Sequence, residues 1–163
     1  MSQIAVADLR GVSSSEIAVP TPPSLVIHRE RLSHAEQTLG VVQRLRGALE
    51  GNAPTEELLK DLYGDLVKLR RLCGEENPIT TPSVELRVLA DSAEGAVEVV
   101  HPWYRHSLGD PWEFVKKCKL TPELYNFDAK REPPTVSAVA SLEGTVAAIR
   151  QGFVNLARAE EVN

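Results

Sequence analysis

A long apolar stripe in the last third of the chain constrains the fold more than any other feature of the sequence. Its members are Val139, Leu142, Val146, Ile149, Phe153 and Leu156. Their spacings alternate between three and four residues, which is the rhythm of a helix that packs against other helices along one face. The stripe therefore predicts a long helix from about Thr135 to Glu160, packed in a bundle.

Two earlier segments show the same helical period. The first is predicted to begin near Ser33, which has capping-box spacing to Glu36, and to end at Gly51-Asn52. The second follows a possible cap at Thr55 and ends at Gly74. Because the connection is short, the two helices are expected to form an antiparallel hairpin. Their apolar faces comprise Ala35, Leu39, Val42, Leu45 and Leu49 in the first, and Leu58, Leu62, Leu66 and Leu69 in the second.

The apolar period changes after residue 82. Apolar and charged residues alternate over 84–88 and again over 97–99, with a turn-like segment at 91–95 between them. This pattern predicts a β-hairpin over residues 83–101. Two strands alone are barely stable, so residues 25–27 are a candidate third strand.

These elements predict a mainly α fold, an antiparallel four-helix-bundle-like domain with a small β-hairpin or short sheet at one end. A chain of 163 residues fits one such domain. We expect an extended, proline-punctuated N-terminal arm over 1–27, the bundle domain over 28–160, and a tail over 161–163.

Composition narrows the classes of function. The net charge of −5 argues against a free-standing nucleic-acid binder with a broad basic face, but not against a protein that binds nucleic acid as one of many assembled copies. The sequence shows no membrane span and no secretory signal, so an intracellular setting is expected. The two cysteines, Cys73 and Cys118, form no metal signature and are expected to be reduced.

The sequence offers little support for catalysis. It contains neither a glycine-rich phosphate loop nor a nucleophile elbow. His101 and His106 flank Trp103 and Tyr104, which could belong to a metal or acid–base site, or equally to a surface loop with aromatic anchors. Their spacing matches no ligand geometry. We expect no enzyme activity, no cofactor and no metal.

Basic residues gather in two clusters, at residues 116–119 and at Lys130-Arg131. An ordinary solvated face is one explanation for each cluster. The second cluster follows Phe127-Asp128 and precedes a proline pair. Repeated along a polymer, its cations would form a continuous track for phosphates.

The order of elements and three short pieces resemble the coat proteins of rod-shaped, helical plant RNA viruses, the tobamovirus-like (virgavirus) group. The first piece is Thr81-Pro82-Ser83-Val84-Glu85-Leu86-Arg87 with Asp91-Ser92, similar to the strand that leaves that family's second helix. The second is Phe127-Asp128-Ala129-Lys130-Arg131, similar to its Phe-Asp corner. The third is Thr145-Val146-Ala147-Ala148-Ile149-Arg150, followed by Asn155-Leu156, similar to its last long helix.

The resemblance implies roles for four residues. Asp128 and Arg150 would form a structural ion pair near the RNA groove, and Lys130, Arg131 and Arg150 would bind nucleic acid. The β-hairpin and the aromatic segment around Trp103 would lie on the outer side of the particle, away from the groove.

The implied function is a capsid subunit that self-assembles into a helical rod of identical copies and packages single-stranded RNA. Such a protein is expected in the virion and the host cytoplasm, without a membrane partner. The alternative is a small helical adaptor or interaction module that forms a discrete oligomer. An enzyme is the third hypothesis, and it lacks a convergent polar pocket.

Overall fold

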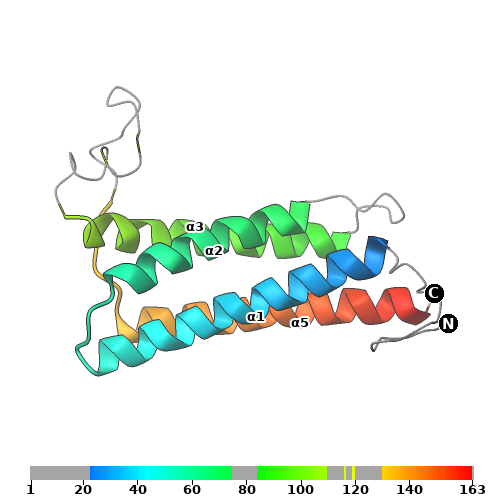
Figure 1. Cartoon of the computed structure of the whole chain (residues 1–163), viewed down its shortest axis with the longest axis horizontal. Helices are drawn as coiled ribbons and strands as arrows, with labels where there is room; N and C mark the ends of the chain where they lie inside the picture. Colours follow the sequence, from blue (N-terminus) through cyan, green and yellow to red (C-terminus); the bar gives the residue numbers. More distant parts are fainter. Residues whose placement is uncertain (1–22, 75–83, 110–115, 117–118, 120–129, 163) are drawn as a thin grey trace, which may run out of the picture.

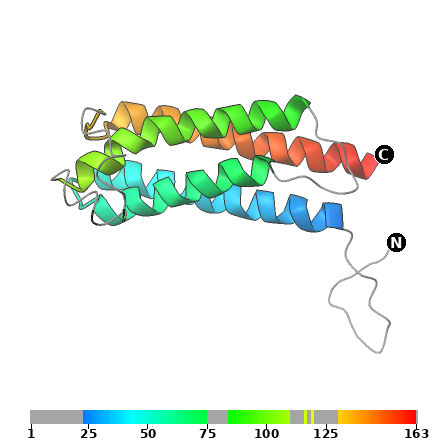
Figure 2. The ribbon, with the colours of Figure 1, turned by 90° about the horizontal axis from the view of Figure 1, so that it is seen from above.

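The computed structural model describes residues 23–74, 84–109, 116, 119 and 130–162. The long helices in this part of the chain are α1 (Pro23–Glu50), α2 (Glu56–Gly74), α3 (Val84–Ser107) and α5 (Val136–Val162). They run alternately in opposite directions, and each packs on two others in the ring α1–α2–α3–α5 (Figures 1 and 2). The prediction of a mainly helical fold with four mutually packed helices is confirmed.

The bundle has two distinct ends, which we name for what lies there. The crossover end holds Glu50, Glu56, Ser107 and Val136, where two helices finish and two begin. The terminal end holds Pro23, Gly74, Val84 and Val162 (Figure 1).

The apolar stripes supply the core, as the sequence predicts. In α5, every stripe residue from Val139 to Phe153 is buried, and Leu156 packs partly buried against the same core. In α2, Leu62, Leu66 and Leu69 are fully buried. The burial of these side chains is the main favourable contribution to folding.

The first helix ends at Gly51-Asn52, as predicted, through a Schellman motif. Asn52 adopts a left-handed conformation with φ of 55°, which asparagine tolerates better than most residues. The Ala53 N–H donates to the Ala48 carbonyl at 2.8 Å, and the Asn52 N–H donates to the Leu49 carbonyl at 3.4 Å. These two bonds satisfy carbonyls that the end of a helix would otherwise leave without donors.

Threonines begin two of the helices. The Thr55 carbonyl accepts the first hydrogen bond of α2, from the Leu59 N–H at 2.9 Å. The Thr135 hydroxyl accepts the Ala138 N–H at 3.1 Å, which caps α5. Both positions agree with the helix starts predicted from the sequence.

The predicted β-hairpin over residues 83–101 is wrong. Residues 84–107 form α3, residues 25–27 lie within α1, and none of the described residues forms a strand. In this helix Leu86 packs partly buried against the core, whereas Val84 and Val88 are exposed. The alternation of apolar and charged residues over 84–88 therefore does not mark the buried face of a strand. A second stripe with helical spacing makes the buried face of α3, and consists of Ala93, Ala96, Val97, Val100 and Trp103.

The first helix begins ten residues earlier than predicted. Pro23 is its first residue, whereas the sequence pointed to Ser33. Proline suits the first turn of a helix, where its missing N–H would have no partner in any case. Residues 1–22 of the predicted arm lie outside the described residues, and residues 23–27 are helical.

A polar seam, absent from the predictions, lies between α1 and α2. Arg31, His34 and Thr38 are all buried. The Arg31 Nε donates to the Leu72 carbonyl at 2.9 Å. The His34 Nε2 lies 2.7 Å from the Asp65 carbonyl, and because a carbonyl only accepts, this nitrogen carries the proton. The Thr38 hydroxyl donates to the His34 carbonyl at 2.8 Å.

Candidate nucleic-acid interface

Lys130 and Arg131 lie at the crossover end, shortly before α5. The backbone next to them is attached to α3, since the Glu132 N–H donates to the Pro102 carbonyl at 3.2 Å. Pro102 lies inside α3, where its missing N–H removes one backbone hydrogen bond of the helix. Its carbonyl accepts the hydrogen bond from the segment that precedes α5. The basic pair is therefore held against the end of α3.

The two cations differ in exposure. The Lys130 side chain is 70% exposed, and its Nζ lies 3.3 Å from a Glu132 carboxylate oxygen. Exposed ion pairs of this kind are weak, so a phosphate could replace the carboxylate. Arg131 is half-buried, and its guanidinium donates to the carbonyl of Gly109, which lies just after α3 and has φ of 73°.

Further basic groups lie beneath this surface. Arg105 is buried, and its burial, followed by the charge of Arg131, lowers the pKa of its guanidinium. Burial, followed by the charge of Arg105, also lowers the pKa of His101. Each of these shifts has a neighbouring cation among its causes, so positive charge accumulates at the crossover end.

Aromatic rings pack beside the cations. Tyr63 stacks on Tyr104 with ring centroids 5.0 Å apart and planes tilted by 12°, and its centroid lies 5.5 Å from that of His101. Trp103 is buried in the core. It is therefore not a surface anchor. Trp103 lies in the last turns of α3, at the crossover end, and its neighbour Pro102 accepts the hydrogen bond from Glu132, so this segment and the basic pair are at the same end of the bundle.

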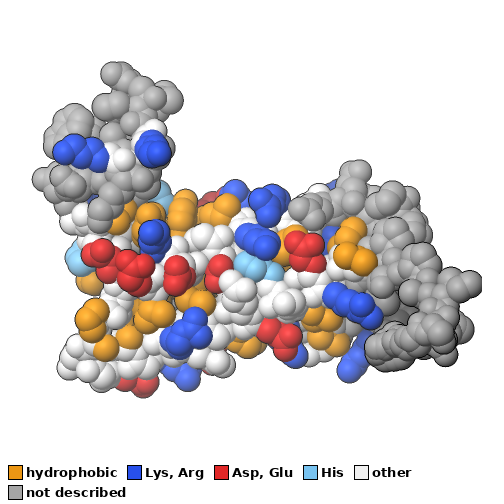
Figure 3. Space-filling view, in the orientation of Figure 1, with side chains coloured by type: hydrophobic (Ala, Val, Ile, Leu, Met, Phe, Trp, Pro, Cys, Tyr) orange, Lys and Arg blue, Asp and Glu red, His pale blue; other side chains and the backbone are white. Residues whose placement is uncertain are grey.

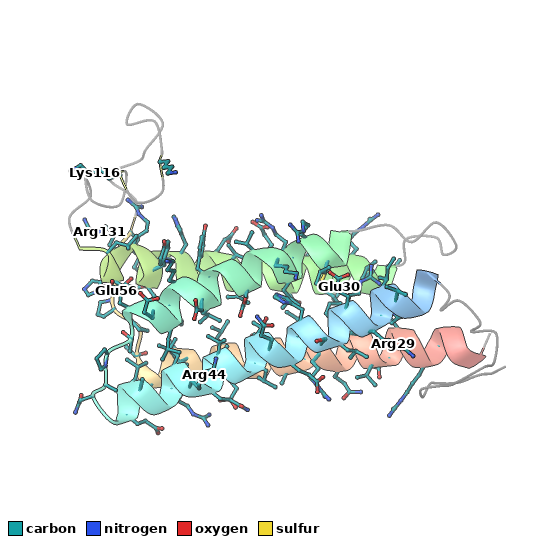
Figure 4. All side chains as sticks on the ribbon, viewed as in Figure 1. Arg29, Glu30, Arg44, Glu56, Lys116 and Arg131 are labelled. Carbon is teal, nitrogen blue, oxygen red and sulfur yellow. The ribbon has the colours of Figure 1, made fainter. Side chains whose placement is uncertain are left out.

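Positive charge is concentrated in one part of the sequence. Residues 105–131 contain six Lys and Arg against four Asp and Glu, a net charge of +2, so the rest of the chain carries −7 of the total of −5. Figure 4 shows Lys116 and Arg131 at the crossover end, with Glu56 of α2 below them. In Figure 3, blue side chains lie at this end, and a row of red side chains lies below them. Lys116, Lys119 and Lys130 are exposed.

Arg150 lies apart from this cluster. It is in the middle of α5, about 21 Å along the helix from Val136 at 1.5 Å per residue. Its guanidinium is 3.3 Å from a Glu36 carboxylate oxygen of α1. Asp128, the partner that the resemblance implies, lies outside the described residues. The structure thus brings Lys130 and Arg131 together but not Arg150 with them.

Sequence reasoning missed Arg105 as a member of this cluster. Its burial follows from its position one turn after His101 and from the contact between α3 and the segment that carries Arg131. That contact joins residues far apart in sequence, and no local pattern marks it. The i, i+4 spacing of His101 and Arg105 was the one available signal that both belong to one face of a helix.

Other kinds of site find no support in the described part of the chain. Among residues 23–74, 84–109 and 130–162, no three His, Cys, Asp or Glu side chains are grouped to hold a metal ion. No helix in these ranges is long and apolar enough to span a membrane. Comparisons of this chain with protein-family models, with curated proteins and with solved structures found no match.

Proposed function

We propose that this chain is a structural coat subunit that self-assembles into a helical rod and packages single-stranded RNA through its crossover end. One observation carries the proposal: exposed cations gather at that end of a bundle whose remaining sequence is acidic. In this proposal Lys130 and Arg131 contact phosphates, with Lys116 and Lys119 beside them. The protein would then be found in the virion and in the host cytoplasm.

Phosphate contacts suit a protein that must cover RNA of any sequence. Lysine and arginine bind phosphate oxygens without reading bases. A few contacts per subunit give weak binding, but identical copies repeated along a strand add their contacts and release counterions at each one. The acidic remainder of each subunit would keep polyanions away from every other face.

The support beneath the cations favours ordered contacts with a strand. Hydrogen bonds from Glu132 to Pro102 and from Arg131 to Gly109 attach the basic segment to α3. A group that is already positioned loses less conformational freedom on binding than one on a free loop. The same attachment would repeat the cations at a constant spacing in an assembly.

Assembly into a polymer of identical subunits is inferred from the resemblance to helical plant-virus coat proteins. Head-to-tail contacts between identical subunits that do not close into a ring produce a helical filament. The likeness at Phe127-Asp128-Ala129-Lys130-Arg131 is one of sequence, and residues 127–129 lie outside the described residues, whereas residues 84–87 of the first piece are helical instead of strand. Arg150 is paired with Glu36 in the structure, so the ion pair with Asp128 that the resemblance implies stays a prediction on which this proposal does not depend.

Negative-stain electron microscopy tests the proposal directly. The purified chain would be imaged with and without RNA between about pH 5 and pH 8, the range in which carboxylates crowded between subunits lose their protons. We expect discs or rods that lengthen with RNA and protect it from nuclease, with equal protection for RNAs of unrelated sequence. Small uniform particles under every condition would reject the coat proposal and favour the adaptor.

A further inference from the structure

Three rings gather where α2 and α3 meet near the crossover end. The Tyr63 and Tyr104 rings lie almost parallel, 12° apart, with their centroids separated by 5.0 Å, and the His101 ring centroid is 5.5 Å from that of Tyr63. We call these three residues the ring cluster. All three side chains are half-buried, so each keeps part of its surface in contact with solvent.

The packing of α2 does not by itself require an aromatic ring at residue 63. The buried residues of α2 are Leu59, Leu62, Leu66, Leu69, Leu72 and Cys73. Tyr63 stands at the edge of this face, where another leucine would bury a similar apolar area. Aromatic residues make up only 5% of the chain, so two stacked tyrosines at one end are a local feature of the molecule.

The ring cluster adjoins the basic pair through α3. Arg131 donates to the carbonyl of Gly109, just after the last turn of α3. Its charge contributes to the lowered pKa of Arg105, and the charge of Arg105 contributes in turn to the lowered pKa of His101. Because His101 contacts the Tyr63 ring, cations and aromatic rings form one continuous group of side chains at the crossover end.

This combination suits a strand whose bases are unpaired. Unpaired bases stack on aromatic side chains, while the phosphates of the same strand bind lysine and arginine. The bases of a duplex are already stacked on one another, so a duplex would offer this surface little more than its phosphates. An apolar peptide, by contrast, would make no use of the neighbouring cations.

We propose that the ring cluster stacks unpaired bases while Lys130 and Arg131 hold the adjoining phosphates, so that the crossover end prefers single strands to duplexes. The inference rests on the proposed function, because it concerns the same RNA-binding end, and it adds a contact with the bases. Every base has a π-face, so stacking remains compatible with RNA of any sequence.

Fluorescence anisotropy of the full chain with three labelled probes tests the inference. The probes are a short RNA single strand, an abasic strand with the same number of phosphates, and a duplex that contains the RNA strand. The parent chain should bind the single strand at least about fivefold more tightly than the abasic strand, the ratio expected when one base stacks. It should also bind the single strand more tightly than the duplex.

Two pairs of substitutions separate the bases from the phosphates. Tyr63→Leu with Tyr104→Leu should abolish the preference for the base-bearing strand and leave the slope of log affinity against log salt unchanged. Lys130→Ala with Arg131→Ala should lower that slope and retain the preference. Tyr63→Phe with Tyr104→Phe keeps both rings and should behave as the parent chain does.

Far-UV circular dichroism verifies that each variant is helical. If the double leucine variant does not fold, the single substitutions Tyr63→Leu and Tyr104→Leu should each reduce the preference. Equal affinity of the parent chain for the base-bearing and abasic strands would overturn the inference and leave the proposed function standing on its phosphate contacts. A preference that survives both leucine substitutions would also overturn it. Failure to bind any of the probes would reject the proposed function together with the inference.

Discussion

Arg31 of α1 donates a hydrogen bond from Nε to the backbone carbonyl of Leu72, 2.9 Å away in the last turn of α2. Carbonyls in the last turn of a helix have no donor within the helix, and the helix dipole favours a cation there. A side chain from one helix thus completes the end of another. Arg31 also lies near enough to Cys73 for its charge to lower the pKa of the thiol, although burial outweighs this effect.

Replacing Arg31 by Met should destabilise the bundle by about 1–3 kcal/mol. Methionine has a similar length but leaves the buried Leu72 carbonyl without its donor, and a buried acceptor without a partner costs about that much. The free energy of unfolding from urea denaturation measures the effect. Arg29→Met, an exposed change on the same helix, should alter stability by no more than about 0.5 kcal/mol. Equal effects of the two changes would show that the hydrogen bond contributes little.

Gly152→Ala and Gly144→Ala should change stability in opposite directions, although both lie in α5. A Cβ at Gly152 would stand 2.5 Å from Leu89 Cδ2 and 3.1 Å from Leu89 Cγ, so either the Leu89 side chain or the packing of α3 on α5 would have to shift. We expect a loss of about 1–2 kcal/mol. Nothing lies within 4 Å of a Cβ at Gly144, where alanine should stabilise the helix by about 0.5–1 kcal/mol.

Thermal unfolding of both variants checks this pair. Adding Leu89→Ala to Gly152→Ala removes the group that the new methyl would meet. The two changes together should therefore cost less than the sum of their separate costs. Strict additivity would mean that the close approach of residues 89 and 152 does not limit the packing of α3 on α5.

Stability should fall below pH 6.5 partly because of His101. Burial, followed by the charge of Arg105, lowers its folded-state pKa from 6.5, so the unfolded chain binds the proton more readily. The stability contributed by neutral His101 is complete above pH 6.5 and is lost as pH falls through the lower folded-state pKa. His101→Gln should flatten the pH dependence of the unfolding free energy between about pH 7 and pH 5. A His101→Gln variant with the same pH dependence as the parent chain would show that His101 does not contribute to it.

The partner of Arg150 can be identified by double-mutant cycles. Its ion pair with Glu36 joins side chains that are 38% and 58% exposed, and such pairs contribute about 0.2–1 kcal/mol. We expect a coupling energy in that range for Glu36→Ala with Arg150→Ala. The same cycle with Asp128→Ala tests the pairing that the resemblance implies. A coupling of a few kcal/mol there would identify a buried pair, and none would remove Asp128 from the environment of Arg150.

Replacing Lys130 and Arg131 together by Ala should lower the affinity for RNA. It should also make that affinity less dependent on the salt concentration. Each phosphate contact to a single strand contributes about 0.7 to the slope of log affinity against log salt, so the slope per subunit should fall by about 1.4. Fluorescence anisotropy with a labelled single strand measures it. Arg29→Ala with Arg44→Ala removes the same charge from exposed positions of α1 and should change the slope much less.

The sequence alone predicted the helices whose buried faces are built from large apolar residues. Leu62, Leu66 and Leu69 of α2 and the stripe of α5 gave a clear period because leucine, valine and phenylalanine recur every three or four residues. In α3 the period was hidden, since the buried face uses Ala93 and Ala96 while valines stand on the exposed face. The pattern of apolar residues in a sequence does not show which of them face the core and which face solvent.

Polar burial was the second limit of sequence reasoning. Arg31, His34 and Thr38 were not assigned to the core because arginine and histidine seldom occur there. Arg31 and His34 bond to carbonyls of α2, which come within reach only once the two helices pack, while the Thr38 hydroxyl bonds to the His34 carbonyl of its own helix. For the same reason, Lys130 and Arg131 were identified as a basic pair from sequence, while their attachment to Pro102 and Gly109 depended on the tertiary fold.

The pairing of α1 with α5 has a consequence for how the chain folds during synthesis. Glu143 of α5 accepts hydrogen bonds from Gln43 and Arg46 of α1, about a hundred residues earlier in the chain. The contacts α1–α2 and α2–α3 join successive helices, so they can form while translation continues. The flank of α1 that receives α5 stays open until α5 has been made. Chains that stop before residue 136 therefore leave the apolar surface that α5 covers in the bundle exposed to water.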